Sequence, residues 1–402
     1  MHQHELPTCR PSWLRALTTS TGALVVAAGV LAANVGASTT AYASAPAPGA
    51  LAGPLPQVNP AITGFSPQSV SYISVSQGWV LGTTPCGSKR CLALLHTTND
   101  GASWSVVHVP PAGPQPGGGP ELSVRFADSE DGWIFSTLPG EGPELGWSTH
   151  NGGQHWAALH FPVSAGPGGV GIEDIEAAGG VADAAVEIGP NVDIFSSPAA
   201  GGTWRRTGGP FEVGAGPVPY GQIVLEGKSG WFLENDRVVV SGAIEQPSGK
   251  WSNWAPPCSK AGGPATLSAV SSSHIVAVCT EGVWTGTKVT VDLLKSPNGG
   301  HSFGPGHLLP FASVGTVAAA GSSALAIGIT VAHANSVDNR LEMSFNGGTS
   351  WQPVYSHAGA GWASLAFTTP DQGIALLDAD SGHLNIVLST SDGGRHWSPV
   401  SF

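Results

Sequence analysis

An eight-residue motif returns along most of this 402-residue chain and constrains the fold more than any other feature. Its fullest copy is TSDGGRHW, Thr390–Trp397. Asp392 can accept backbone N–H groups in an Asx-type turn, and Gly393 and Gly394 permit a positive φ. Trp397 then supplies a large apolar side chain where the next strand would begin. The motif therefore predicts a tight turn that leads into a strand.

Six relatives of the motif give the chain a period. Four have Asn in the Asp place (TTNDGASW, THNGGQHW, SPNGGHSF and SFNGGTSW), SPAAGGTW has Ala199 there, and one is nearly erased, at Trp251 in PSGKW. The aromatic positions lie 46 to 52 residues apart, so seven units result. The positions assigned to turn closure and packing are Asn99, Trp104, Asn151, Trp156, Trp204, Asn298, Phe303, Asn346, Trp351, Asp392 and Trp397.

A second signal keeps the same phase and indicates four strands in each unit. Strands that begin with Gly-Trp or a similar pair precede the turns, as in SQGWVLG and SEDGWIF. For the first unit we expect strands at Val70–Val75, Trp79–Gly82, Leu92–Thr97 and Trp104–Val109. Short Val- and Trp-rich runs with frequent Gly argue against a helical repeat. A period of 40–50 residues with four strands per unit is typical of a β-propeller.

We therefore expect an all-β fold, a single seven-bladed β-propeller of four-stranded blades; six or eight blades are the alternatives. It would occupy residues 65–402, after a signal peptide at 1–43 and a Pro/Ala/Gly-rich linker at 44–64 whose last part, Val58–Ile62, could add a strand. How the ring is closed stays open.

The motif resembles the Asp-box, or BNR, repeat. Together with the Gly-Trp strand it is similar to WD40/YVTN/BNR-like propellers related to the photosystem II assembly factor Ycf48 and to sialidase-like propellers. The resemblance implies that the motif lies between the third and fourth strands, away from the usual ligand-binding face. Asn in four copies also favours a structural role, because an amide can close the turn but cannot act as a general acid or base.

The N-terminus is typical of an export signal. Arg10 and Arg15 precede the apolar stretch Gly22–Ala37, and Ala41-Tyr42-Ala43 offers cleavage before Ser44, with Ala43-Ser44-Ala45 as a second choice. An uncleaved anchor is the rival interpretation, although this stretch is shorter than the roughly 20 residues that span a bilayer. We expect a secreted or cell-surface protein, without a membrane span once the signal is removed.

The net charge of the chain excludes one class of partner. The formal net charge is −12, which argues against nucleic acid as a partner because that ligand needs a basic face.

The cysteine content indicates disulfide bonds. Four of the five cysteines lie beyond the signal, an even number for an oxidising compartment. Proximity in sequence favours disulfides Cys86–Cys91 and Cys258–Cys279 among three pairings. A zinc site is the alternative, but close Cys/His ligand pairs are missing.

No pattern in the sequence indicates catalysis, a metal or a cofactor. A sialidase would need an arginine triad with a Tyr nucleophile, and the few arginines of the chain include Arg395, Arg205 and Arg206 in or beside the motifs. A glycosidase needs two carboxylates across a cleft. Acidic clusters exist, including Asp128/Glu130/Asp131 and Glu173/Asp174/Glu176, but none has calcium-loop spacing.

We expect a non-catalytic binding or scaffold module for a protein or a cell-surface glycan, acting as a monomer. The alternative is a glycoside hydrolase, sialidase-like or other, with its site at the mouth of the channel. Long Gly/Pro-rich connections are expected on the face opposite the motifs, and loops carry function disproportionately. The candidate ligand-binding residues on that face are Glu144, Glu173, Glu234, Asp236, Asp338, Arg340, Trp362 and Asp378.

Overall fold

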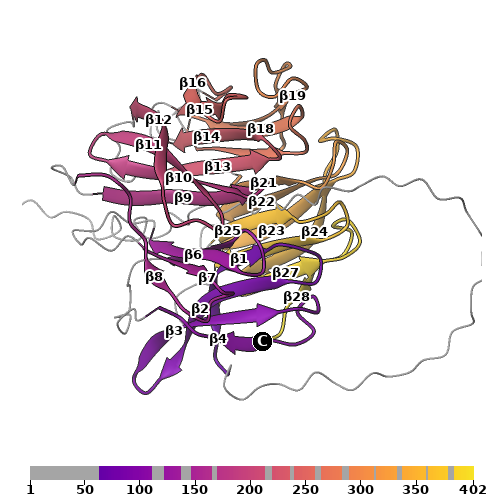
Figure 1. Ribbon diagram of the computed structural model, residues 1–402. Helices are drawn as coiled ribbons and strands as arrows, with labels where there is room; N and C mark the ends of the chain where they lie inside the picture. Colours follow the sequence, from indigo (N-terminus) through magenta and orange to yellow (C-terminus); the bar gives the residue numbers. More distant parts are fainter. Residues whose placement is uncertain are drawn as a thin grey trace, which may run out of the picture.

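The protein is a seven-bladed β-propeller, as the repeat predicts. The computed structural model describes residues 63–110, 122–136, 146–164, 170–212, 220–235, 240–258, 264–282, 289–311, 314–332, 337–358, 361–378 and 384–402. Within these ranges, 28 strands form seven antiparallel sheets of four (Figure 1). The expected signal peptide, and residues 44–62 of the expected linker, lie outside the described residues.

Each blade consists of four strands that are consecutive in the chain. Blades one and two contain β1 (Ser66–Tyr72), β2 (Gly78–Cys86), β3 (Lys89–Thr97), β4 (Ser105–Val107), β5 (Leu122–Phe126), β6 (Asp131–Ser136), β7 (Gly146–His150) and β8 (Ala157–Ala158). Blades three and four contain β9 (Val170–Ala178), β10 (Val181–Ile188), β11 (Asn191–Pro198), β12 (Arg205–Glu212), β13 (Tyr220–Glu226), β14 (Ser229–Asn235), β15 (Val240–Glu245) and β16 (Trp251–Trp254). Blades five and six contain β17 (Ala265–Ala269), β18 (Ile275–Glu281), β19 (Thr290–Ser296), β20 (His307–Leu308), β21 (Thr316–Ala319), β22 (Leu325–Ala332), β23 (Val337–Ser344) and β24 (Gln352–Ala358). Blade seven contains β25 (Gly361–Phe367), β26 (Gly373–Asp378), β27 (Ile386–Thr390) and β28 (Ser398–Pro399).

The first strand begins and ends earlier than the expected Val70–Val75. The N–H groups of Ile73 and Ser74 both donate to Gln77 O, so the chain has already turned where the sequence predicts a strand. The fourth strand is also shorter than expected, Ser105–Val107 instead of Trp104–Val109.

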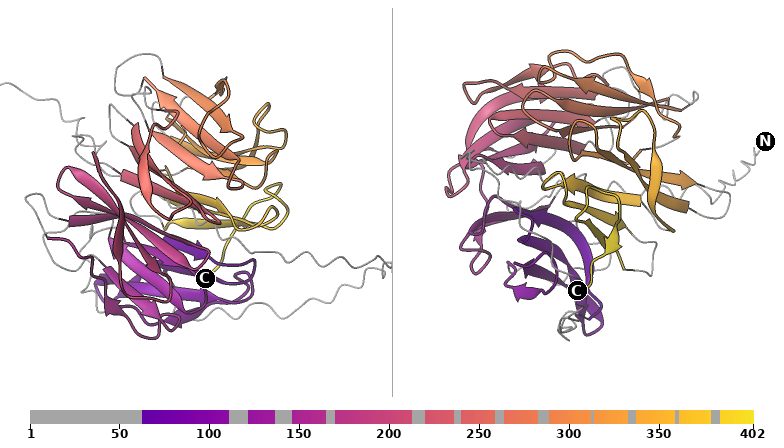
Figure 2. Two further views of the ribbon diagram at one scale, coloured as in Figure 1. Left: turned by 45° about the horizontal axis from the view of Figure 1, so that its top comes forward. Right: turned by 90° about the vertical axis from the view of Figure 1, so that its right-hand side faces the viewer.

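The ring closes by contacts between the first and last blades. The yellow C-terminal strands lie beside the indigo N-terminal ones in every view (Figures 1 and 2). Phe402 packs against Phe65 and Trp104, with ring centroids 5.0 and 5.1 Å apart. Asn385 Nδ2 of blade seven donates to Pro67 O of blade one at 2.8 Å. Every sheet of the described ranges is built from consecutive strands, so no blade there combines strands from the first and last units.

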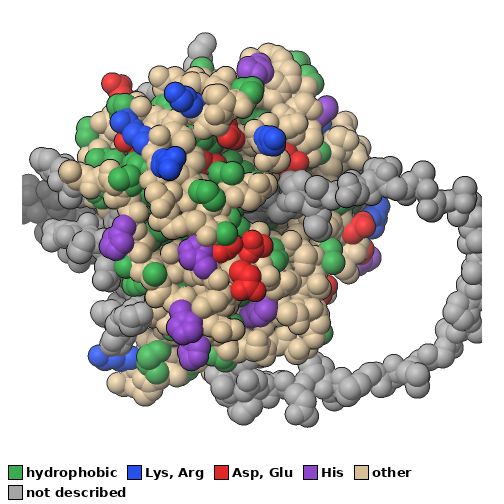
Figure 3. Space-filling view, in the orientation of Figure 1, with side chains coloured by type: hydrophobic (Ala, Val, Ile, Leu, Met, Phe, Trp, Pro, Cys, Tyr) green, Lys and Arg blue, Asp and Glu red, His purple; other side chains and the backbone are tan. Residues whose placement is uncertain are grey.

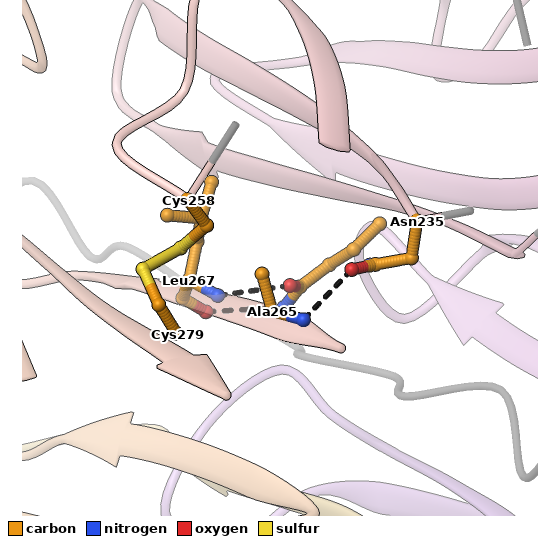
Figure 4. The surroundings of a disulfide bond; sticks show 6 residues. Asn235, Cys258, Ala265, Leu267 and Cys279 are labelled. Atoms are coloured by element: carbon orange, nitrogen blue, oxygen red, sulfur yellow. Dashed lines mark hydrogen bonds between the residues drawn. A yellow bond between two sulfur atoms is a disulfide. The ribbon is translucent and has the colours of Figure 1, made fainter. Parts of the chain in front are cut away.

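Polar side chains on several first strands tie neighbouring blades together. The Val124 N–H donates to Ser69 Oγ at 3.0 Å, and the Ile223 N–H donates to Asp174 Oδ2 at 2.9 Å. Gln222 exchanges two hydrogen bonds of 3.0 Å with the backbone of Leu267. Asn235 Oδ1 accepts the Ala265 N–H at 2.8 Å in the same interface (Figure 4). These bonds satisfy edge N–H and C=O groups that burial between blades would otherwise leave unpaired.

The Gly-Trp pattern is explained by packing across each blade. A Cβ atom on Gly78 would lie 2.6 Å from the Tyr72 ring, and one on Gly132 would lie 2.6 Å from the Phe126 ring. Glycine therefore leaves room for an aromatic ring from the first strand. The tryptophan after it packs between blades: Trp79 is fully buried and stacks on Phe126 with ring centroids 3.8 Å apart.

The eight-residue motif forms the turn between the third and fourth strands. In blade one, Thr97 Oγ1 donates to Asn99 Oδ1, and the N–H groups of Gly101 and Ser103 donate to Thr97 Oγ1 and Asn99 Oδ1, all at 2.9–3.0 Å. The same three bonds recur in blades two, five, six and seven. Blade three lacks the Asx side chain, and Ser197 Oγ donates to Gly201 O instead. The motif is thus a turn-closing device, as expected.

Both expected disulfides are present. Cys86–Cys91 links β2 to β3 within blade one. Cys258–Cys279 joins the segment after β16 to β18, so it ties blade four to blade five (Figure 4). Within the described ranges, the structure contains no helix with the length and apolar character needed to cross a membrane.

Candidate functional site

Two of the predicted ligand-binding residues come together. Glu173 of β9 and Glu234 of β14 meet at the interface of blades three and four, where their exposed fractions are 7% and 1%. The Glu173 carboxyl lies over Gly221, where a Cβ would come within 2.1 Å of its Oε2 atom. Gly221 and Glu234 are paired residues of β13 and β14. From the sequence we expect both glutamates on the ligand-binding face opposite the motifs, whereas in the structure they are buried in the interface of blades three and four.

The surroundings of Glu173 favour its protonated form. Burial raises the pKa of Glu173 to about 7, and the charges of Glu187 and Asp174 add to the rise. The Glu234 carboxyl opposes the rise. Two neighbouring carboxyl groups avoid mutual repulsion when one of them carries a proton. The blade interface therefore favours the protonated form of Glu173.

A second buried charge cluster joins blades two and three. Arg125 of β5 is 1% exposed, and its Nε donates to Glu176 Oε1 at 2.7 Å. Its Nη2 lies 3.8 Å from Asp174 Oδ1. Burial raises the pKa of both carboxyl groups, and the Arg125 charge opposes the rise. Sequence reasoning missed Arg125, because nothing in the local pattern separates a buried arginine from an exposed one.

The remaining predicted residues are spread over blades six and seven or lie outside the described residues. Trp362 of β25 is buried and its Nε1 donates to Ile329 O at 3.1 Å, so it packs blade seven against blade six. Asp378 of β26 accepts a bond from Asn385 Nδ2 at 3.2 Å, beside the ring closure. Arg340 and Asp338 are partly buried on β23 of blade six. Glu144 and Asp236 fall outside the described ranges.

The described surface carries little charge and at least two hollows. On the face in Figure 3, most basic side chains lie in the upper part, one group of acidic side chains lies near the centre, and histidine side chains are scattered over the face. One hollow of about 320 Å³ at the edge of blade one is apolar, with Phe65, Leu92 and Val107 among its walls. Another, of about 480 Å³, lies between blades four and five and combines charged, amide and hydroxyl groups. In the described part of the chain, no group of three or more His, Cys, Asp or Glu residues could hold a metal ion.

No protein-family model and no curated protein matches the sequence. Among solved structures, the chain is similar to "YCF48 bound to D1 peptide", with 17% identity, a TM-score of 0.52, and coverage of 82% of this chain and 93% of that one. A polysaccharide lyase of family PL25, an ulvan lyase, matches with 13% identity, a TM-score of 0.51, and coverage of 81% and 92%. A puromycin-hydrolysing peptidase from Mycobacterium tuberculosis matches with 14% identity, a TM-score of 0.54, and coverage of 87% of this chain and 54% of that one. At these identities the likeness concerns the fold, and it confirms the expected propeller and its resemblance in fold to Ycf48.

Proposed function

We propose that the chain is an exported, non-catalytic binding or scaffold module whose ligand is a protein or a cell-surface glycan. The observation that carries the proposal is the burial of the acidic residues of β9 and β14 between blades. Asp174 and Glu176 neutralise Arg125, and Glu173 contacts Glu234, all at exposed fractions of 7% or less. These groups hold blades together and are closed to a substrate.

The alternative, a glycoside hydrolase, needs a different arrangement of carboxyl groups. Retaining and inverting enzymes hold their two carboxyl groups roughly 5 to 9.5 Å apart, with the sugar between them. Glu173 and Glu234 are both buried in the interface of blades three and four, so this pair is closed to a polysaccharide chain. An enzyme would have to use other residues.

Two further observations support an exported binding module. The disulfides Cys86–Cys91 and Cys258–Cys279 are typical of proteins that fold in an oxidising compartment. The Ycf48 structure holds a peptide, so a propeller of this size can serve as a binding platform. The ulvan lyase is the counterexample, because a similar propeller there is an enzyme.

The test is a panel of glycans and cell-wall polymers in which binding and turnover are measured in the same wells. The full chain is compared with a heat-denatured sample as the control for non-specific adsorption. We expect saturable binding to at least one polymer, without new reducing ends or unsaturated products. Release of such products would overturn the non-catalytic proposal, and failure to bind any polymer would overturn its glycan form.

A further inference from the structure

The apolar hollow on the outer part of blade one opens beside the point where the described chain begins. Its volume is about 320 Å³, and most of its lining is apolar: Phe65, Leu92, Ala93, Leu95, Val106, Val107 and Val109. Thr84 and His108 complete the described lining, so no Lys, Arg, Asp or Glu of the described ranges takes part. Such a hollow selects an apolar occupant, because a charged group would lose its hydration there without a partner.

The hollow is continuous with the core that closes the ring. Phe65, Ala93 and Leu95 are buried and belong to an apolar cluster shared with β26 and β27 of blade seven. The same face of blade one ends on β4, where Val106 is paired with Leu95 and is 55% exposed. Blade seven therefore covers the inner part of this face, and its outer part is exposed in the portion of the chain that the structure describes.

The chain enters the propeller at the rim of this hollow. Phe65 is one of the walls, and its ring lies over Gly82, where a Cβ would come within 2.7 Å of it. Arg90 Nη2 donates to Gly64 O at 2.9 Å, and Arg90 Nε donates to Thr83 Oγ1 at 2.7 Å. Blade one thus fixes the residue just before Phe65, and the preceding residues of the chain start within reach of the hollow.

The preceding segment has the composition that this hollow requires. Residues 44–62 include no charged side chain, and the last eight of them have the sequence LPQVNPAI. Leu55, Val58 and Ile62 are aliphatic, and the two prolines restrict the backbone in advance, which lowers the entropy cost of ordering it. Eight residues span at most roughly 26–29 Å, so reach does not limit the contact. Because the segment is tethered beside the hollow, its effective concentration there is on the order of millimolar.

We propose that residues 55–62 bind in the hollow on blade one through Leu55, Val58 and Ile62, so that the N-terminal segment of the chain covers the seam between the first and last blades. Each other pair of neighbouring blades is joined by the chain itself, whereas this seam is held by side chains such as Phe65 and Phe402. An additional apolar contact therefore contributes most at this interface. The inference does not depend on the ligand of the proposed binding module.

The test measures how fast a thiol at position 106 reacts with a maleimide in the absence of reductant. The four cysteines beyond the expected signal form two disulfides, so Val106→Cys supplies the single free thiol of a secreted chain that starts at Ser44. This variant is compared with the same variant lacking residues 55–62, and deletion of residues 45–52 is the control of equal length. Val75→Cys, on the β1–β2 turn and 49% exposed, is the matched control for labelling.

We expect V106C to react at least about tenfold faster after residues 55–62 are deleted, because a bound segment must first detach before the reagent reaches the thiol. Deletion of residues 45–52 should leave this rate unchanged, and V75C should react at one rate in all three chains. Deletion of residues 55–62 should also lower the midpoint of thermal unfolding by about 3–5 °C, the shift expected when the burial of one or two aliphatic side chains is lost.

Equal labelling of V106C with and without residues 55–62 would overturn the proposal. Slow labelling in both chains that becomes faster on dilution would also overturn it, because the occupant would then be a second copy of the chain. If the deletion prevents folding, Val58→Asp combined with Ile62→Asp in the full segment takes its place, with Ala47→Asp as the control. Carboxylates cannot enter an apolar hollow without losing their hydration, so a V106C rate that this double substitution leaves unchanged would equally count against the contact.

Discussion

Replacing Glu173 with Gln should remove a pH dependence of stability that originates in the Glu173–Glu234 contact. The pKa of Glu173 rises from 4.5 to about 7 on folding, mainly through burial. A raised carboxyl pKa means that the folded state holds its proton more tightly than the unfolded chain does. The corresponding stabilisation is fully present below pH 4.5 and is lost as the pH rises through about 7.

The size of the effect follows from this difference in pKa. At about 1.4 kcal/mol per pKa unit, the loss between pH 4 and pH 8 is on the order of 3 kcal/mol. Glutamine keeps the shape of the protonated acid and does not titrate, so E173Q should be increasingly more stable than wild type as the pH rises. With a urea m-value of about 3 kcal/mol/M, the two midpoints should separate by about 1 M at pH 8.

The assay is urea unfolding followed by tryptophan fluorescence at several pH values between 4 and 8. The difference in the free energy of unfolding between wild type and E173Q separates the titration of Glu173 from that of the groups near it, which include Asp174 and Glu187. Glu130→Gln, on the exposed β5–β6 turn, is the matched control and should follow wild type at every pH. Parallel curves for wild type and E173Q would refute the reasoning, because the buried contact would then hold no additional proton.

Three further predictions test the packing, the buried charge and the turns. Gly132→Ala places a Cβ 2.6 Å from the Phe126 ring and should cost roughly 1–3 kcal/mol in thermal unfolding, whereas Gly202→Ala, which faces open space, should cost little. Arg125→Met leaves Asp174 and Glu176 buried without their cation and should cost about 3–5 kcal/mol in urea unfolding at pH 7, part of which E176Q should restore. Asp392→Ala removes the acceptor of the Thr390 and His396 bonds and should cost about 1 kcal/mol, while Asp392→Asn should be nearly neutral, because Asn fills that place in four other blades. An equal loss for both Asp392 variants would show that the carboxylate charge matters there. Desolvation raises the pKa of Asp392, and the hydrogen bonds from His396 and Thr390, with the His396 charge, together lower it to about 2.

The fold could be predicted because its determinants are local. The motif of Thr390–Trp397 contains the hydroxyl, the Asx side chain and the glycines that close one turn, so it marks each hairpin without knowledge of the rest of the chain. The Gly-Trp pair is equally informative, because Gly78 and Gly132 accommodate aromatic rings from strands only a few residues away. Patterns that depend on neighbouring residues can be recognised in a single sequence.

The candidate site could not be predicted in the same way, because its contacts cross between blades. Glu173 and Glu234 are 61 residues apart and meet only through the placement of β9 against β13. Arg125 reaches Glu176 across a similar interval. Glu173 and Glu234 belong to strands and are buried, so a search for charged residues in loops does not reveal that they are neighbours.

A repeat protein also shows which of its units departs from the shared turn. Six blades keep a buried hydroxyl at the first motif position because each must close the same turn, and Asn or Asp serves equally well beside it in five of them. Blade four has Glu245 at the end of β15 instead, and its shorter hairpin is closed by the Gln246 N–H, which donates to Lys250 O at 2.8 Å. The erased motif that the sequence shows at Trp251 is therefore a turn of a different length. The Glu245 carboxyl lies near Asp183 of blade three: burial raises its pKa, and the charge of Asp183 adds to the rise.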